Sequence, residues 1–261
     1  MKGEKLTGKF KRAQAYQMRY WDEQWKDNRE RQQRAKKIWS RYINILKAQA
    51  DLKPSDKILD IGCGPCGMIN FIPAGERYGV DPLMDYYLSN FDMPQEVKWI
   101  KGSGEDLPFA DKQFNIVIAT DTLDHAENPS KILGEMKRVL KDGGFVFLTV
   151  NTYSQITNLI KNIHRKLDIE SPAELGSFSF KQVRRLLESF GFRIVNSWHD
   201  VLDLEATTTS GNRVSEFKKN FRKVWKIKQQ DGLKEALKFT LAFLTGGRSY
   251  QGDSIFIATK P

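Results

Sequence analysis

The 261-residue chain contains only two cysteines, Cys63 and Cys66, and only three histidines. Two cysteines cannot build a disulfide framework, and so few histidines leave a zinc site short of ligands. No apolar run approaches the roughly 20 residues needed to cross a bilayer, since the best candidate, residues 236–245, is interrupted by Lys238. The first residues carry charge but lack the apolar stretch of a signal peptide, so we expect a cytoplasmic protein.

The composition, 40% hydrophobic and 28% charged, is typical of a folded globular chain. The net charge of +10 is unevenly distributed. Residues 1–56 carry 15 Lys and Arg against 7 Asp and Glu, and residues 213–238 carry 9 against 3. The basic character therefore belongs to two segments, which marks them as candidate surfaces for an anionic partner.

Short apolar runs rich in β-branched and aromatic residues alternate with helical patterns, which predicts a sheet covered by helices on both faces. We expect an α/β fold with a doubly wound, seven-stranded, mainly parallel sheet. The predicted strands are Lys57–Ile61, Arg77–Asp81, Val97–Lys101, Phe114–Thr120, Phe145–Asn151, Phe192–Ser197 and Ser254–Thr259.

Two of the helices have recognisable ends. Pro129 opens a helix predicted to reach Leu140, where a Lys-Asp-Gly-Gly sequence ends it. Ser179, followed three residues later by Gln182, forms a capping-box pattern for a helix that ends before Gly191.

The pattern divides the chain into three parts. Residues 1–56 are predicted to form a basic helical extension, because aromatic residues recur there at spacings of three and four. The core comprises residues 57–200 and 254–261. Residues 201–253 form a basic, amphipathic helical insertion before the last strand, where such a fold usually needs only a short connection.

The first predicted strand runs into a glycine-rich turn, Gly62-Cys-Gly-Pro-Cys-Gly67, and Asp81 follows Asp60 by 21 residues at the end of the next strand. That context and separation predict a nucleoside site in which Asp81 takes the ribose hydroxyls. Asp60 and Pro65 disfavour a pyrophosphate, which needs free N–H groups and no nearby anion. The loop instead suits a ligand with an amino-acid tail and a cationic centre, to which Asp60 offers negative charge.

The run ILDIGCGPCG resembles motif I of the class I S-adenosylmethionine-dependent methyltransferases. Three further segments resemble the small-molecule, ubiquinone/menaquinone-type branch of that family, a methyltransferase domain 11-like group: YGVDP, GSGEDLPFADKQFNIVIATDTLDHAENP and ILGEMKRVLKDGGFVFLTVN. The similarity covers about residues 55–200 and the final strand. It implies a Rossmann-like methyltransferase fold and S-adenosylmethionine as the cofactor.

The resemblance also implies roles for single residues. The three loop residues Gly62–Gly64 would line the methionyl part, Gly104 and Glu105 would lie along the adenine, and Thr120 would sit beside the sulfonium. Ser103 stands where the family commonly has an aspartate, and it would accept a weaker hydrogen bond from the adenine amino group. The complete predicted cofactor site is Asp60, Gly62, Cys63, Gly64, Asp81, Ser103, Gly104, Glu105 and Thr120.

His125, just past the fourth strand, is the predicted general base, because a neutral imidazole can accept a hydroxyl proton near pH 7. Asp124 would orient it or bind the substrate. A structural or cofactor-lining role for His125 is the alternative, and a divalent metal held by Asp121, Asp124 and His125 is another. No metal is part of the predicted site.

The fourth strand ends in Thr120-Asp121-Thr122-Leu123, without the Asn/Asp-Pro-Pro-aromatic motif of enzymes that methylate amino groups of nucleic acids. We therefore expect a hydroxyl acceptor on a small, glycosyl or lipid-linked molecule, with an amine or a carbon as the alternative nucleophile. The Cys63-Gly-Pro-Cys66 pair also matches the thioredoxin motif, but it lies within the nucleotide loop, which argues against redox function.

Residues 213–245 combine lysines with Phe217, Phe221 and Trp225 and continue into an apolar helix, a pattern that favours an anionic membrane surface. The chain would then lie peripherally at the inner membrane face. RNA contact and simple solvation are the alternatives. Residues 151–177 and the N-terminal helices, with Tyr20 and Trp21, are expected to cover the site. An RNA-associated methyltransferase, an inactive cofactor-binding module and an oxidoreductase that uses NAD remain alternative functions.

Overall fold

The computed structural model describes residues 8–25, 29–153, 175–198 and 252–261. It contains one seven-stranded sheet in the order β3-β2-β1-β4-β5-β7-β6. Strands β1 to β5 pair in parallel, whereas β7 runs antiparallel between β5 and β6. The strands are β1 Lys57–Ile61, β2 Glu76–Asp81, β3 Val97–Lys101, β4 Phe114–Thr120, β5 Leu140–Thr152, β6 Arg193–Trp198 and β7 Gly252–Thr259. The expected mainly parallel, doubly wound sheet is confirmed.

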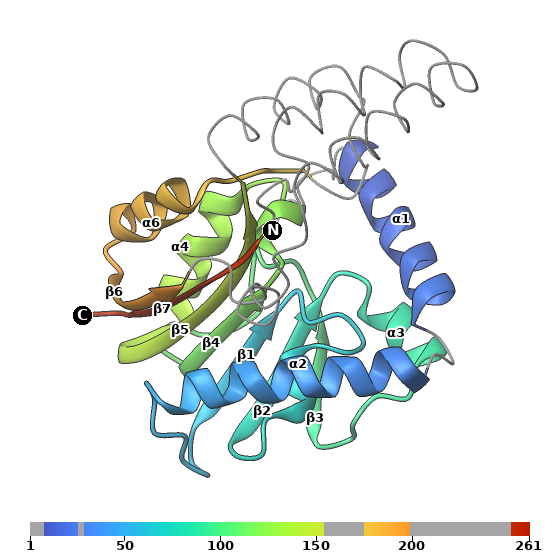
Figure 1. Cartoon of the computed structure of the whole chain (residues 1–261), viewed down its shortest axis with the longest axis horizontal. Coiled ribbons are helices and arrows are strands. Elements are labelled where there is room, and N and C mark those ends of the chain that lie inside the picture. The colour runs from blue at the N-terminus through green and yellow to red at the C-terminus, as the bar shows by residue number, and fades with distance from the viewer. Residues whose placement is uncertain (1–7, 26–28, 154–174, 199–251) are drawn as a thin grey trace, which may run out of the picture.

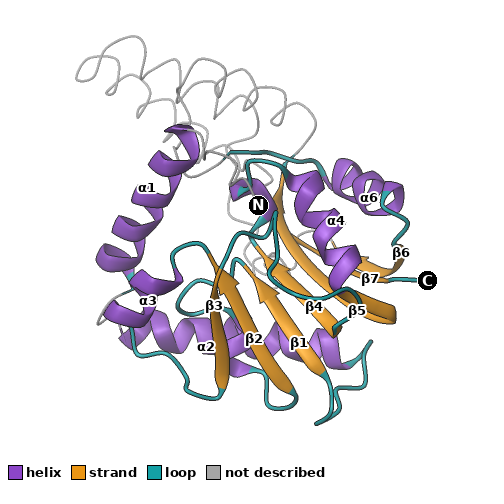
Figure 2. Ribbon diagram, turned by 180° about the vertical axis from the view of Figure 1, so that it is seen from behind, coloured by secondary structure: helices purple, strands orange, loops and turns teal. Residues whose placement is uncertain are grey.

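Helices cover both faces of the sheet (Figures 1 and 2). The helical elements are α1 Gly8–Gln24, α2 Arg29–Lys47, η1 Met68–Phe71, α3 Met84–Asn90, η2 Leu123–His125, α4 Pro129–Val139 and α6 Phe180–Ser189. Helix α2 crosses one face, and its residues Tyr42, Ile43 and Leu46 are buried there against the sheet. Helices α4 and α6 lie on the opposite face.

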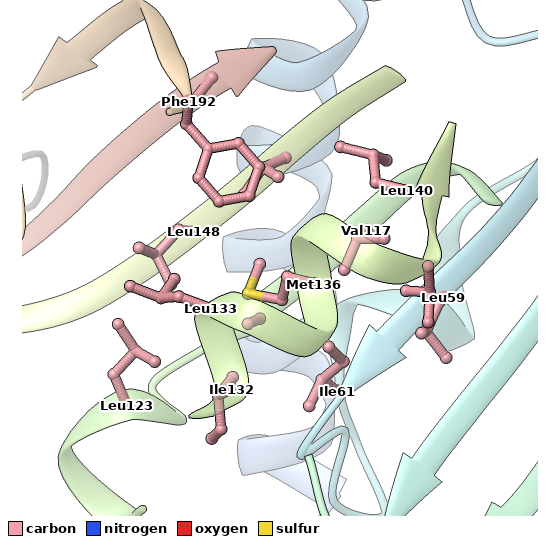
Figure 3. Packing of buried hydrophobic residues seen from close by; sticks show 14 of the residues in the cluster. Leu59, Ile61, Val117, Leu123, Ile132, Leu133, Met136, Leu140, Leu148 and Phe192 are labelled. Carbon is pink, nitrogen blue, oxygen red and sulfur yellow. The ribbon is translucent and has the colours of Figure 1, made fainter. Parts of the chain in front are cut away.

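The core on the α4 side is built from apolar residues spaced at three and four along that helix, namely Ile132, Leu133 and Met136. Figure 3 shows them between Leu59 and Ile61 of β1 and Leu148 of β5. All but Ile132 are fully buried, at 0% exposure. Burial of such side chains contributes about 2 kcal/mol each, so this layer fixes β1 and β4 and with them the loops at their carboxyl ends.

The structure agrees with the predicted start of α6 but not with the predicted end of α4. Ser179 and Gln182 form the complete capping box that starts α6. Helix α4, however, ends at Val139, one residue before the predicted Leu140, which already pairs with Phe114 of β4. Strand β5 therefore begins five residues earlier than Phe145, and Gly143, with φ +73°, lets it bend where the register shifts.

The predicted insertion, residues 201–253, and most of the covering segment 151–177 lie outside the described residues. The three-part division of the chain stays a prediction. Within the described part of the chain, no helix is long and apolar enough to cross a membrane.

Candidate cofactor and acceptor site

The loop after β1 takes a shape that only glycine adopts easily. Gly62 and Gly64 have φ values of +67° and +53°, in the left-handed region that side chains disfavour. A Cβ on Gly62 would lie 2.7 Å from the Thr122 side chain, and one on Gly64 would lie 3.0 Å from the Trp21 ring. The turn is thus held between the end of β4 and helix α1, and glycine is required for both approaches.

Asp81 fastens this loop to the neighbouring strand. Parallel pairing places Ile61 beside Val80, so the carboxyl ends of β1 and β2 meet at the same edge of the sheet. One carboxylate oxygen of Asp81 accepts the Gly64 N–H at 3.1 Å, and the other accepts the Leu83 N–H at 2.8 Å. Each oxygen keeps a second lone pair for a ligand hydroxyl.

A cavity of about 570 Å³ opens at this edge of the sheet. Its size suits a small-molecule ligand together with part of a second one. Nine predicted site residues line it: Gly62, Cys63, Gly64, Asp81, Ser103, Gly104, Glu105, Thr120 and His125. The structure thus brings together residues from four strand ends that are distant in the sequence.

Two predicted site residues, Asp60 and Asp124, are not among those that line the cavity. Asp60 is fully buried behind the loop, where Oδ2 accepts the Ile69 N–H at 3.2 Å and Oδ1 has no hydrogen-bond partner among the described residues. Burial raises its pKa to about 8, with a contribution from the charge of Asp81. Its electrostatic influence on a bound cation stays a prediction, because a direct contact would have to pass through the loop.

Asp124 is buried next to His125 in η2. Its main-chain oxygen accepts the N–H groups of Leu175 and Gly176 at 2.7 and 2.8 Å. Its Oδ2 lies 4.0 Å from His125 Nε2, beyond hydrogen-bond distance. Because Asp124 is buried and does not line the cavity, the geometry offers no support for substrate binding by its side chain, and the orienting role stays a prediction.

Ser103 and Glu105, at the predicted adenine end, both have protein hydrogen-bond partners. Ser103 Oγ accepts the Glu105 N–H at 3.2 Å. Glu105 Oε1 accepts the Asn128 N–H at 2.7 Å, which ties this loop to the start of α4. These bonds order the loop and leave the Ser103 hydroxyl hydrogen for a further contact, so its role toward the adenine stays a prediction.

Helix α1 forms the wall of the cavity opposite the strand ends. The N-terminal helices were expected to cover the site, and α1 lies in that position. Tyr20 and Trp21 line the cavity, and Gln17 Nε2 lies 3.5 Å from His125 Nδ1. Trp21 also packs edge-on against Tyr87 of α3, with ring centroids 6.3 Å apart. In Figures 1 and 2 the end of α1 lies beside α3.

The sequence reasoning missed Gln17, Trp25 and Trp39 as lining residues. A signal for two of them was present, since Gln17, Trp21 and Trp25 follow one another at intervals of four and therefore share one face of a helix. Trp39 has no comparable signal. It reaches the site from α2, where its Nε1 donates to the main-chain oxygen of Cys66 at 2.8 Å.

The cysteine pair lacks the electrostatic setting of a redox site. Both thiols are free, and burial raises both pKa values, that of Cys66 to about 11. A catalytic thiol pair needs a lowered pKa instead. Among the described residues no group of three or more histidine, cysteine or acidic side chains is placed to hold a metal ion, so the metal alternative at Asp121, Asp124 and His125 finds no support in this geometry.

Comparisons with known proteins identify the class of domain that contains this cavity. A profile described as a methyltransferase domain matches residues 59–148. An uncharacterized methyltransferase of Schizosaccharomyces pombe is 37% identical over 110 residues, 36% of this chain and 40% of that protein. The sarcosine/dimethylglycine N-methyltransferase of Aphanothece halophytica is 29% identical over 150 residues, 53% of this chain and 52% of that protein. The matches thus span about half or less of these two relatives.

Among solved structures, phosphoethanolamine N-methyltransferase 2 of Haemonchus contortus in complex with S-adenosyl-L-methionine aligns with a TM-score of 0.54 at 18% identity. The alignment covers 85% of this chain and 53% of that one, and it supports the fold. Residues 59–148 are a methyltransferase domain of the class I, S-adenosylmethionine-dependent type. S-adenosylmethionine is its cofactor. The glycine turn and the Asp81 carboxylate, whose spare lone pairs face the cavity, fit that molecule.

Cofactor affinity should fall in acid, because the Asp81 carboxylate, which is predicted to take the ribose hydroxyls, accepts their hydrogen bonds best when it is ionised. Burial raises the pKa of Asp81 to about 6, despite opposing hydrogen bonds from Leu83 and Gly64. At pH 5 the ligand-free protein holds Asp81 mostly protonated, so S-adenosylmethionine should bind about tenfold more weakly than at pH 7.5. Calorimetric titration at the two pH values measures this.

The stability of the ligand-free protein should change with pH in the opposite direction, because it should be higher at pH 5 than at pH 7.5. The raised carboxyl pKa values stabilise the fold below about pH 4, and this contribution is lost as the pH rises from about 4 to about 6 for Asp81 and to about 8 for Asp60. The thermal shift produced by the cofactor should therefore be larger at pH 7.5 than at pH 5. A cofactor affinity that is constant or stronger at pH 5 would refute this role of Asp81.

Proposed function

We propose that the protein transfers the methyl group of S-adenosylmethionine to a hydroxyl oxygen of a small, uncharged acceptor, with His125 as the general base. The observation that carries this is the position of His125. Its imidazole lines the same cavity as the Gly62–Gly64 turn and Asp81, and its side chain is 32% exposed. A hydroxyl arrives protonated, so its methylation needs a base at this place.

The walls of the cavity support an uncharged acceptor. None of the described lining residues is a lysine or arginine, so the described walls offer an anionic acceptor no permanently cationic partner. Aromatic side chains from α1, among them Phe10, Tyr16 and Tyr20, suit an acceptor with an aromatic or other apolar part. The absence of a described basic residue disfavours a phosphorylated or carboxylated acceptor at this end.

The chemistry that S-adenosylmethionine supplies is an activated methyl group on sulfur. As the acceptor oxygen bonds to the methyl carbon and the carbon–sulfur bond breaks, His125 takes the hydroxyl proton. Gln17 Nε2 lies 3.5 Å from Nδ1 of the ring, whereas Asp124 Oδ2 lies 4.0 Å from Nε2, beyond hydrogen-bond distance. Most of the rate gain comes from holding the two reacting groups in line, to which the α1 residues that line the cavity would contribute.

A panel of matched acceptors tests this proposal. Each set contains an alcohol or phenol, an amine and a carboxylate on one skeleton, for example 1-naphthol, 1-naphthylamine and 1-naphthoate. We expect S-adenosylhomocysteine release, followed by mass spectrometry, to favour the hydroxyl member of a productive set by at least about tenfold. A preference for the amine would contradict the proposed nucleophile, and it would fit the N-methyltransferases among the relatives.

The finer parts of the sequence prediction are part of the proposal. A glycosyl or lipid-linked acceptor and a cytoplasmic location belong to it, and peripheral binding at the membrane rests on the basic residues 213–245. Those residues lie outside the described part of the chain. Addition of anionic phosphatidylglycerol vesicles to the same assay would extend the acceptor panel to lipid-linked alcohols.

A further inference from the structure

In the loop after β1, the main-chain N–H groups of residues 62–65 offer few hydrogen-bond donors to an anionic group of a ligand. The N–H groups of Gly62 and Cys63 both donate to Val80 O, at 2.8 and 3.4 Å. The Gly64 N–H is taken by Asp81, and Pro65 has no N–H. The indole of Trp39, which lines the cavity beside Cys66, already donates to the main-chain oxygen of that residue.

Trp25 supplies a donor that has no partner. Its Nε1 is buried, and no hydrogen-bond acceptor among the described residues reaches it, although its ring lines the cavity. The position is fixed by α1, because the Trp25 N–H donates to Trp21 O at 3.0 Å and the two indole rings lie 5.3 Å apart. Trp21 in turn lies against Gly64, so Trp25 is one ring away from the loop.

A buried indole N–H without an acceptor is costly, by about 1–3 kcal/mol, unless a ligand completes it. The end of the cofactor expected over Gly62–Gly64 is the methionyl part, which carries a carboxylate. None of the described residues that line the cavity is a lysine or arginine to receive that carboxylate. The indole N–H of Trp25, which lacks an acceptor, and the cofactor carboxylate, which lacks a cationic partner, thus belong to the same end of the cavity.

We propose that the indole N–H of Trp25 donates a hydrogen bond to the α-carboxylate of S-adenosylmethionine. A hydrogen bond to a charged oxygen is roughly twice as strong as a neutral one, so a neutral indole can hold the carboxylate without a counter-charge. Because Trp25 is carried by α1, the same bond would hold the α1 wall against the bound cofactor.

The test compares two ligands that differ only in the carboxylate, S-adenosylmethionine and decarboxylated S-adenosylmethionine. Trp25→Phe keeps an aromatic ring but removes the N–H. It should weaken S-adenosylmethionine about tenfold or more in calorimetric titration and leave the decarboxylated ligand within about twofold of wild type. Trp39→Phe is the matched control, because it removes an indole N–H from the same cavity that is already bonded to Cys66 O. It should shift both ligands equally or neither.

Nuclear magnetic resonance of the unaltered protein gives a second readout that does not depend on the variant folding. Six tryptophans give six indole N–H signals, and that of Trp25 should move downfield with S-adenosylmethionine but not with the decarboxylated ligand. Equal weakening of both ligands by Trp25→Phe, no weakening of either, or an indole signal that responds alike to both ligands would overturn the proposal.

Discussion

Replacing His125 by asparagine should lower the methylation rate of a hydroxyl acceptor by about 10²–10⁴-fold, the usual contribution of a general base. The variant keeps a polar group near the Gln17 amide, which contacts Nδ1 in the wild type, but it cannot accept the acceptor proton. Initial rates of S-adenosylhomocysteine formation, with the best acceptor from the matched panel, measure the loss.

The accompanying control separates catalysis from folding and cofactor binding. Affinity for S-adenosylmethionine should stay within about twofold, because the predicted cofactor contacts lie at the glycine turn and at Asp81 rather than at His125. A rate within threefold of wild type would show that His125 lines the site without acting as a base. A parallel loss of rate and cofactor affinity would assign it to the structure of η2.

Replacing Asp81 by asparagine should weaken S-adenosylmethionine by about 100-fold, or about 2.7 kcal/mol. In the wild type both carboxylate oxygens are acceptors, one for Gly64 N–H and one for Leu83 N–H. The amide turns one of them into a donor that faces a donor, which disturbs the loop and removes the charge expected to hold the ribose hydroxyls.

Asp85→Asn is the matched control for this variant. Asp85 lies four residues further along the chain, but its side chain is 70% exposed and pairs with Lys101 at 2.5 Å. Loss of such a surface pair changes stability by less than about 1 kcal/mol, and cofactor affinity should not change. Calorimetry at pH 7.5, with thermal unfolding to check the fold, measures both variants. A loss below threefold in Asp81→Asn would remove Asp81 from the cofactor site.

Much of the central sheet could be predicted from local sequence. The limits of β1, β3 and β4 agree with the predicted Lys57–Ile61, Val97–Lys101 and Phe114–Thr120. These strands are short apolar runs bounded by turn residues, so the information that defines them lies within a few neighbours. The early start of β5 at Leu140 could not be predicted that way, because it depends on pairing with Phe114 in another strand.

In the candidate site, too, features set by neighbouring residues could be predicted, whereas features set by contacts between distant segments could not. Glycines and Asp81 were found because a strand–turn pattern fixes their place, and the cavity includes them. The buried setting of Asp60 behind the loop depends on Ile69, which packs there from η1. The contact between Gln17 and His125 joins residues 108 positions apart, and no local pattern in a single sequence encodes such a distance.

The measurement that tests the account most directly is calorimetric titration of the wild-type protein with S-adenosylmethionine and, separately, with NAD. The account predicts a single S-adenosylmethionine site per chain with a Kd in the micromolar range, about −8 kcal/mol, and no heat from NAD. Binding of NAD in the same range, or no response to S-adenosylmethionine, would contradict the claim that the cavity at the ends of β1, β2 and β4 is a methyl-donor site.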